Sequence, residues 1–66
     1  MKEIEDFKML RKGDKIRKYL DSSKISYRDY TVKIGGKAEG GRLICAISNS
    51  VPEWLNIYDV VKLKDC

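Results

Sequence analysis

The 66-residue chain contains no histidine, so it lacks the side chain that most often serves as a general base or a metal ligand. Its two cysteines, Cys45 and Cys66, are far apart and supply too few ligands for a metal site. Ser48 and Ser50 have no identifiable base near them in the sequence, and most carboxylates stand beside a lysine or arginine, as solvated surface charges do. The sequence therefore predicts a non-enzymatic protein without a metal or cofactor.

Long apolar segments are also missing. The longest apolar run, residues 43–47, is far shorter than the roughly 20 residues of a membrane-spanning helix. Residues 1–6 are acidic and do not resemble the apolar core of a secretory signal, so we expect a cytoplasmic protein. In that compartment a Cys45–Cys66 disulfide is improbable, and Cys45 is expected to be a buried free thiol.

The length allows one domain, residues 1–66, and a domain of this size buries only about 60% of its unfolded-chain surface. The apolar fraction is 42% and the charged fraction is 36%, with both signs present. This composition is typical of a small folded domain and not of a disordered chain.

Alternating apolar and polar residues predict five short strands, at 14–20, 27–34, 42–48, 53–57 and 60–64. Turn residues occupy 21–24 and 49–52, and residues 58–59 fit a single helical turn. The same alternation predicts a core consisting of Ile16, Tyr30, Val32, Ile34, Leu43, Cys45, Ile47, Leu55, Ile57, Val61 and Leu63.

A glycine-rich segment, residues 35–41, is predicted to be a mobile hairpin tip between the second and third strands. It is not a phosphate-binding loop, because such a loop ends in Gly-Lys-Ser/Thr and opens a helix. Here Gly41 and Arg42 instead begin a predicted strand.

Ile4, Phe7 and Leu10 recur at intervals of three near the N-terminus, which predicts an amphipathic helix over residues 2–11. Such a short helix must dock on another element, and we expect it to cover Ile44 and Ala46. An extended N-terminal arm is the alternative.

The layout of residues 12–64 resembles that of the SH3-like barrels. A Lys12-Gly13-Asp14-Lys15-Ile16 entry leads to an irregular loop, and two strands joined by a long hairpin follow. A short turn, a fourth strand, one helical turn at residues 57–59 and a last brief strand complete the order. The resemblance implies a mostly β fold, an SH3-like barrel of about five short strands, with residues 1–11 as a short N-terminal helix or arm. A five-stranded OB-like barrel is the alternative, although it usually needs a helix between its third and fourth strands.

Positive charge is concentrated in residues 11–42, which hold ten of the fourteen lysines and arginines and four acids, a net charge of 10 − 4 = +6. Lys15, Arg17 and Tyr19 are expected on one face of the first strand. Cations beside an aromatic ring are typical of surfaces that bind single-stranded nucleic acid. The predicted nucleic-acid-binding residues are Lys12, Lys15, Arg17, Tyr19, Lys33 and Arg42.

Two other interpretations remain open at this point. The cations could form an ordinary solvated surface. Alternatively, the chain could be an accessory or regulatory module that binds a protein partner; in length and composition it resembles the accessory proteins carried by phages and plasmids. Trp54 with Tyr19 or Tyr58 would then line a groove, or an uncovered Ile44 and Ala46 would favour dimerisation.

Overall fold

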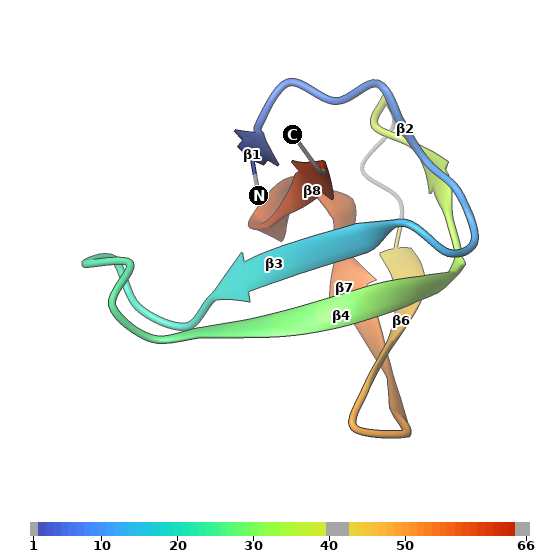
Figure 1. Cartoon of the computed structure of the whole chain (residues 1–66). Coiled ribbons are helices and arrows are strands. Elements are labelled where there is room, and N and C mark those ends of the chain that lie inside the picture. Colours follow the sequence, from blue (N-terminus) through green and yellow to red (C-terminus); the bar gives the residue numbers. More distant parts are fainter. Residues whose placement is uncertain (1, 40–42, 65–66) are drawn as a thin grey trace.

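The fold is an open antiparallel sheet curled around one core (Figure 1). The computed structural model describes residues 2–39 and 43–64. Its elements are β1 (Lys2–Ile4), β2 (Met9–Leu10), β3 (Lys15–Tyr19), β4 (Tyr27–Ile34), β5 (Gly36–Lys37), β6 (Leu43–Ser48), β7 (Val51–Asn56), the 3₁₀ turn η1 (Ile57–Asp59) and β8 (Val60–Lys64). Six strands form one sheet in the order β1-β8-β3-β4-β6-β7, while β2 and β5 form a two-stranded ribbon.

The five predicted strands and the helical turn are confirmed. The bounds of β4 and β8 agree with the prediction, and η1 has the bounds of the helical turn expected at residues 57–59. The β6–β7 turn is tighter than predicted: Asn49 and Ser50, with φ of 51° and 65°, form a two-residue hairpin loop, and Val51 and Pro52 already belong to β7. Such loops match the natural twist of paired strands.

The predicted N-terminal helix is wrong, because residues 2–11 form the strands β1 and β2 and a connecting segment. Ile4 is paired with Lys62 of β8, and Leu10 is paired with Gly36 of β5. Figure 1 shows the segment running as an extended chain from β1 to β2. A ten-residue helix is marginal by itself, whereas two short strands find backbone partners in other parts of the sheet. No α-helix occurs in residues 2–39 and 43–64, and η1 is too short to span a membrane.

The expected closed barrel is also wrong. Within the described residues, β1 and β7 are the two edges of the main sheet and do not pair with each other. Leu10 of the β2–β5 ribbon, 1% exposed, belongs to the core, and Phe7 and Ala38 pack against it. The β2–β5 ribbon thus covers apolar side chains that were expected to be covered by an N-terminal helix and enclosed by a closed barrel.

The core lies on the inner face of the curled sheet. Its members are Leu10, Ile16, Tyr30, Val32, Ile44, Ala46, Leu55, Ile57 and Val60. The buried Tyr30 hydroxyl donates a hydrogen bond of 2.8 Å to Glu53, so its polar end is satisfied. Burial, together with this carboxylate, raises the pKa of Tyr30. The complete burial of Ile44 and Ala46 removes them as a dimerisation surface.

The predicted core is partly confirmed. Seven of its members are buried: Ile16, Tyr30, Val32, Cys45, Leu55, Ile57 and Leu63. Ile47 and Val61 are half-buried. The prediction is wrong for Ile34 and Leu43, which are 52% and 60% exposed.

A β-bulge explains the exposure of Ile34. Val32 is opposite Ala46, but Ile34 is opposite Cys45, so Lys33 is an extra residue in the ladder. An inserted residue shifts the alternation by one and turns the following side chain to the other face. Leu43 shares the outer face of β6 with Cys45, because β6 directs Ile44 and Ala46 inward.

The glycine-rich segment is only partly described. Gly36 and Lys37 form β5 and pair with β2, so the beginning of the predicted hairpin tip is itself a strand. Residues 40–42, which include the end of that tip and the candidate binding residue Arg42, lie outside the described residues.

Candidate nucleic-acid interface

The β3–β4 hairpin aligns the predicted binding residues with a second set of polar and aromatic side chains. Lys15 is opposite Thr31, Arg17 is opposite Asp29, and Tyr19 is opposite Tyr27. Directly opposed residues on paired strands share a face. These three pairs therefore form one strip on the outer face of the sheet, away from the core; we call it the β3–β4 strip.

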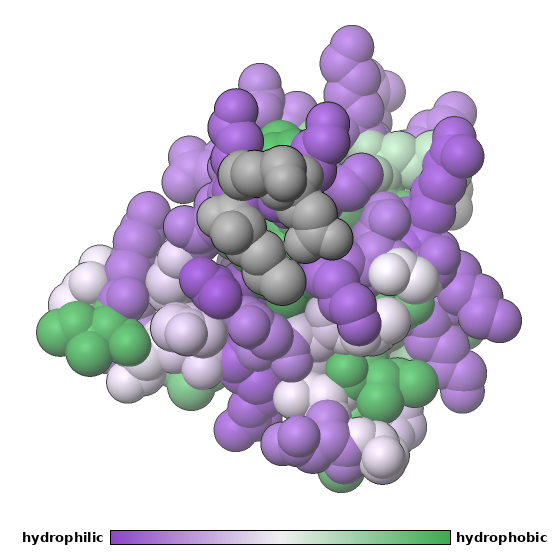
Figure 2. All heavy atoms as spheres, in the orientation of Figure 1, coloured by the Kyte–Doolittle hydropathy of each residue, from purple (hydrophilic) through white to green (hydrophobic). Residues whose placement is uncertain are grey.

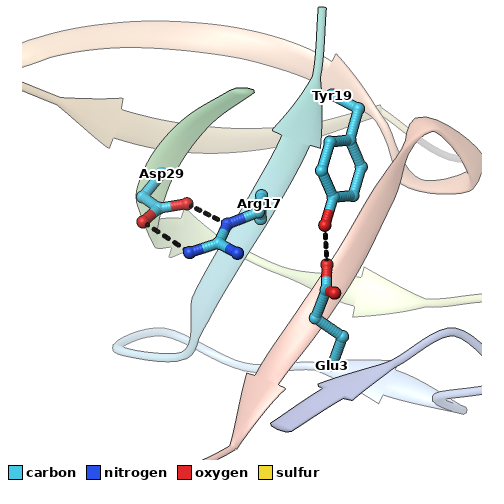
Figure 3. Close-up of polar contacts among 4 residues, drawn as sticks. All are labelled: Glu3, Arg17, Tyr19 and Asp29. Carbon is cyan, nitrogen blue, oxygen red and sulfur yellow. Dashed lines mark hydrogen bonds and ion pairs between the residues drawn. The ribbon is translucent and has the colours of Figure 1, made fainter. Parts of the chain in front are cut away.

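Arg17 is held in the centre of the strip by Asp29 (Figure 3). Its Nε donates to one carboxylate oxygen at 2.7 Å, and Nη2 donates to the other at 3.3 Å. The guanidinium carbon also lies 3.9 Å from the centroid of the Tyr27 ring, within cation–π range. The hydrogen bonds to Asp29 raise the pKa of Arg17 further above its ordinary value, so Arg17 carries its charge at any physiological pH.

Tyr19 closes one end of the strip. Its hydroxyl donates a hydrogen bond to the Glu3 carboxylate of β1 (Figure 3). Its ring meets Tyr27 edge-on, with 6.1 Å between centroids, and the Lys24 ammonium lies 5.5 Å from its centroid. The bond to Glu3 raises the pKa of Tyr19, because the phenol must stay protonated to donate. This contribution to stability is therefore complete below the ordinary tyrosine pKa near 10 and is lost as pH rises through the higher folded-state value.

Lys15 lies at the other end of the strip, beside a shallow hollow. Its Nζ donates to Thr31 Oγ1 at 2.8 Å. The hollow has a volume of about 220 Å³, and Asp29, Ile47, Asn49 and Leu63 also line it. One ammonium and one carboxylate on its wall suit a small polar group better than an apolar one.

Lys12 and Lys33 belong to two backbone segments that meet beyond the Lys15 end of the strip. The Gly13 N–H donates to the Val32 carbonyl at 2.9 Å, which holds the residue 12 turn against the bulge at residue 33. Both lysines are exposed. Five of the six predicted binding residues thus occur along one hairpin, and Arg42, the sixth, lies outside the described residues.

The sequence interpretation counted Asp29 among the acids of residues 11–42 but did not place any carboxylate beside the strip. Asp29 pairs with Arg17, Glu3 binds Tyr19, and Glu5 lies 3.6 Å from Lys24. The centre of the strip is therefore closer to neutral than the charge count of residues 11–42 suggests. Asp29 and Tyr27 could have been found by pairing residue 19 with residue 27 across the predicted turn, whereas the contact with Glu3 depends on β1, which was predicted to be helical.

Figure 2 shows that hydrophilic residues predominate on the face that carries β3 and β4 at the front of Figure 1. No family model, curated protein or solved structure matches the chain.

Proposed function

We propose that this chain is a non-enzymatic binding module whose β3–β4 strip contacts single-stranded nucleic acid. The observation that carries the proposal is the Arg17–Tyr27–Tyr19 cluster on the outer face of β3 and β4: two tyrosine rings in contact, one of them beneath a guanidinium. Aromatic rings supply stacking surfaces for bases of any sequence, and nearby cations attract phosphates.

The proposed roles divide along the strip. Tyr27 and Tyr19 would stack on bases, while Lys12, Lys15 and Lys33 would contact phosphates. Arg17 would act as a positioning residue, because Asp29 already satisfies two of its donors and its guanidinium lies over the Tyr27 ring. Binding would be largely independent of sequence, since phosphate contacts and stacking carry little base information.

The element order supports the proposed likeness to the SH3-like group in layout alone. Five strands run β8-β3-β4-β6-β7, and a single 3₁₀ turn precedes the last strand along the chain. Fold likeness by itself says little about function.

Removing a stacking ring should weaken binding more than removing an exposed tyrosine elsewhere. Tyr27→Ala should lower the affinity for a single-stranded oligonucleotide by about 1–3 kcal/mol, the range for loss of one base–aromatic stack. Tyr58→Ala is the matched control, because Tyr58 is exposed but lies in η1.

Lys15→Gln should lower the slope of log affinity against log salt by about 1, as expected for one lost phosphate contact. Fluorescence anisotropy at several salt concentrations measures both; equal effects of Tyr27→Ala and Tyr58→Ala would contradict the assignment.

Neutralising Asp29 should strengthen binding. Asp29→Asn removes a negative charge that repels phosphates from the strip and keeps a side chain of similar shape. We expect affinity to rise several-fold at low salt and the difference to shrink as salt screens the charge. The cost in folding stability should be small, at most about 1 kcal/mol, because the pair is partly exposed. Weaker binding by a folded Asp29→Asn protein would show that the ion pair itself forms the contact surface.

A protein partner is the second candidate. The observation that favours it is the exposure of Ile34, Leu43 and Trp54 on a different part of the outer face.

A further inference from the structure

The loop at the tip of the β3–β4 hairpin, residues 20–26, adds a cation to the tyrosine end of the β3–β4 strip. Lys24 belongs to this loop, and its ammonium lies 5.5 Å from the centroid of the Tyr19 ring. The three lysines already described are at the opposite end of the strip. The strip therefore has cations at both ends, and Lys24 was not among the predicted binding residues.

Hydrogen bonds within the loop fix the backbone around Lys24. The Asp21 carboxylate accepts from the Ser23 hydroxyl at 2.9 Å and from the Ile25 N–H at 3.3 Å, on either side of Lys24. Lys24 itself has a φ of 60°, a left-handed conformation that is uncommon for a residue other than glycine. The loop thus presents the Lys24 side chain from a defined turn, and this turn does not depend on any partner of its ammonium.

The acidic segment of residues 2–6 lies against this end of the strip. It holds three acids and one lysine, a net charge of −2. The Glu3 carboxylate accepts the hydrogen bond of the Tyr19 hydroxyl (Figure 3), and the Glu5 carboxylate lies 3.6 Å from the Lys24 ammonium. Two donors at the tyrosine end therefore already hold anionic oxygens. Asp6, the third acid, forms no ion pair with any residue that the structure describes.

We propose that the Tyr19 hydroxyl and the Lys24 ammonium form a phosphate site, which Glu3 and Glu5 occupy until nucleic acid displaces them. This inference rests on the proposed function of the strip. Phosphate oxygens accept hydrogen bonds from the same donors as carboxylate oxygens do. Each base of a single strand carries its phosphate on the adjoining sugar, so a base stacked on the Tyr19 ring brings a phosphate to this end. The two carboxylates thus act as an intramolecular competitor of the nucleic acid.

The Glu5–Lys24 pair is weak enough to be displaced. The Lys24 side chain is 61% exposed and the Glu5 side chain is 75% exposed. Ion pairs this open to water add little to stability, so a phosphate can replace Glu5 at small cost. The exchange still lowers the net affinity, because the free energy of the broken contact is subtracted from that of binding. Removing the Glu5 charge should therefore strengthen binding.

The experiment is a double-substitution cycle, in which the full chain is titrated at low salt into a fluorescent single-stranded oligothymidylate and anisotropy is measured. Glu5→Gln should raise the affinity about two- to fivefold, the factor that corresponds to one exposed ion pair. Asp6→Asn is the matched control: it removes an equal charge from the same segment and should raise the affinity less. Lys24→Gln should lower the affinity and reduce the slope of log affinity against log salt by about 1. In the Lys24→Gln protein, Glu5→Gln should have no larger effect than Asp6→Asn.

All three side chains are exposed, so the variants should fold, which circular dichroism checks. Lys24→Asn, which tolerates the left-handed backbone, replaces a Lys24→Gln protein that does not fold. A larger effect of Glu5→Gln than of Asp6→Asn that disappears without Lys24 would support the proposal.

Three results would overturn the phosphate site while the wild type still binds, and so leave the proposed function intact. They are equal effects of Glu5→Gln and Asp6→Asn, a Glu5→Gln effect that persists without Lys24, and an unchanged salt slope in Lys24→Gln. An absence of binding by both the wild type and Glu5→Gln would instead overturn the proposed function, and this site with it.

Discussion

Gly35→Ala should destabilise the protein severely. A Cβ atom at Gly35 would lie 2.0 Å from the Leu10 carbonyl oxygen and 2.6 Å from its carbon. Backbone atoms cannot escape by changing rotamer, so β2 must move away from β5, and this movement would withdraw Leu10 from the core. The free energy of unfolding should fall by about 2–5 kcal/mol, which is typical of deleting a buried leucine side chain.

Gly13→Ala is the control for the Gly35 substitution. Gly13 has open space around its Cβ position but a φ of +95°. Its replacement should cost only about 1–2 kcal/mol through backbone strain. Urea unfolding of both variants measures the difference. A Gly35→Ala protein as stable as the wild type would show that β2 and β5 are not packed as closely as described.

Ile44→Ala should remove a large part of the total stability. Ile44 is completely buried, and its cross-strand partner Leu55 is buried as well. Truncating such a side chain costs about 2–5 kcal/mol. Proteins are stabilised by roughly 0.05–0.15 kcal/mol per residue, or about 3–10 kcal/mol for a chain of this length. The substitution is therefore expected to lower the melting temperature by tens of degrees or to unfold the protein.

Ile34→Ala is the matched control, because Ile34 is an isoleucine on the neighbouring strand with half of its surface exposed. It should cost less than about 1.5 kcal/mol, since much of the removed surface is already in water. Thermal unfolding followed by circular dichroism compares the two. Equal losses of stability would mean that the inner and outer faces of the sheet have been assigned incorrectly.

Local patterns were enough to predict most of the strands. Tyr30 and Val32 alternate with polar residues over one strand length, and this pattern located β4 along its whole length. The alternation failed after Val32, because nothing in the sequence distinguishes Lys33 as an extra residue in the ladder. The position of a bulge depends on the partner strand, which lies beyond the glycine-rich segment.

The N-terminal strands could not be predicted from local patterns either. The spacing of Ile4, Phe7 and Leu10 fits a helix, but it also fits a chain whose side chains meet different elements in turn. Pairing of β1 with β8 joins the two ends of the sequence, and no local signal reports such a contact. For the candidate site, the shared face of Lys15, Arg17 and Tyr19 was predictable from alternation alone. Asp29 required in addition the pairing of the two predicted strands across their turn, and Glu3 was not predictable because it comes from β1, which was expected to be helical.

The most direct test of the proposed function is residue-resolved NMR of the ¹⁵N-labelled protein during titration with a short single-stranded oligonucleotide at low salt. The β3–β4 assignment predicts that the largest amide shifts fall within residues 15–19 and 27–33 and at Lys12. It also predicts that these shifts weaken as salt is added and that residues 51–56 of β7 change little. An absence of shifts at low salt, or shifts concentrated in β7, would contradict it.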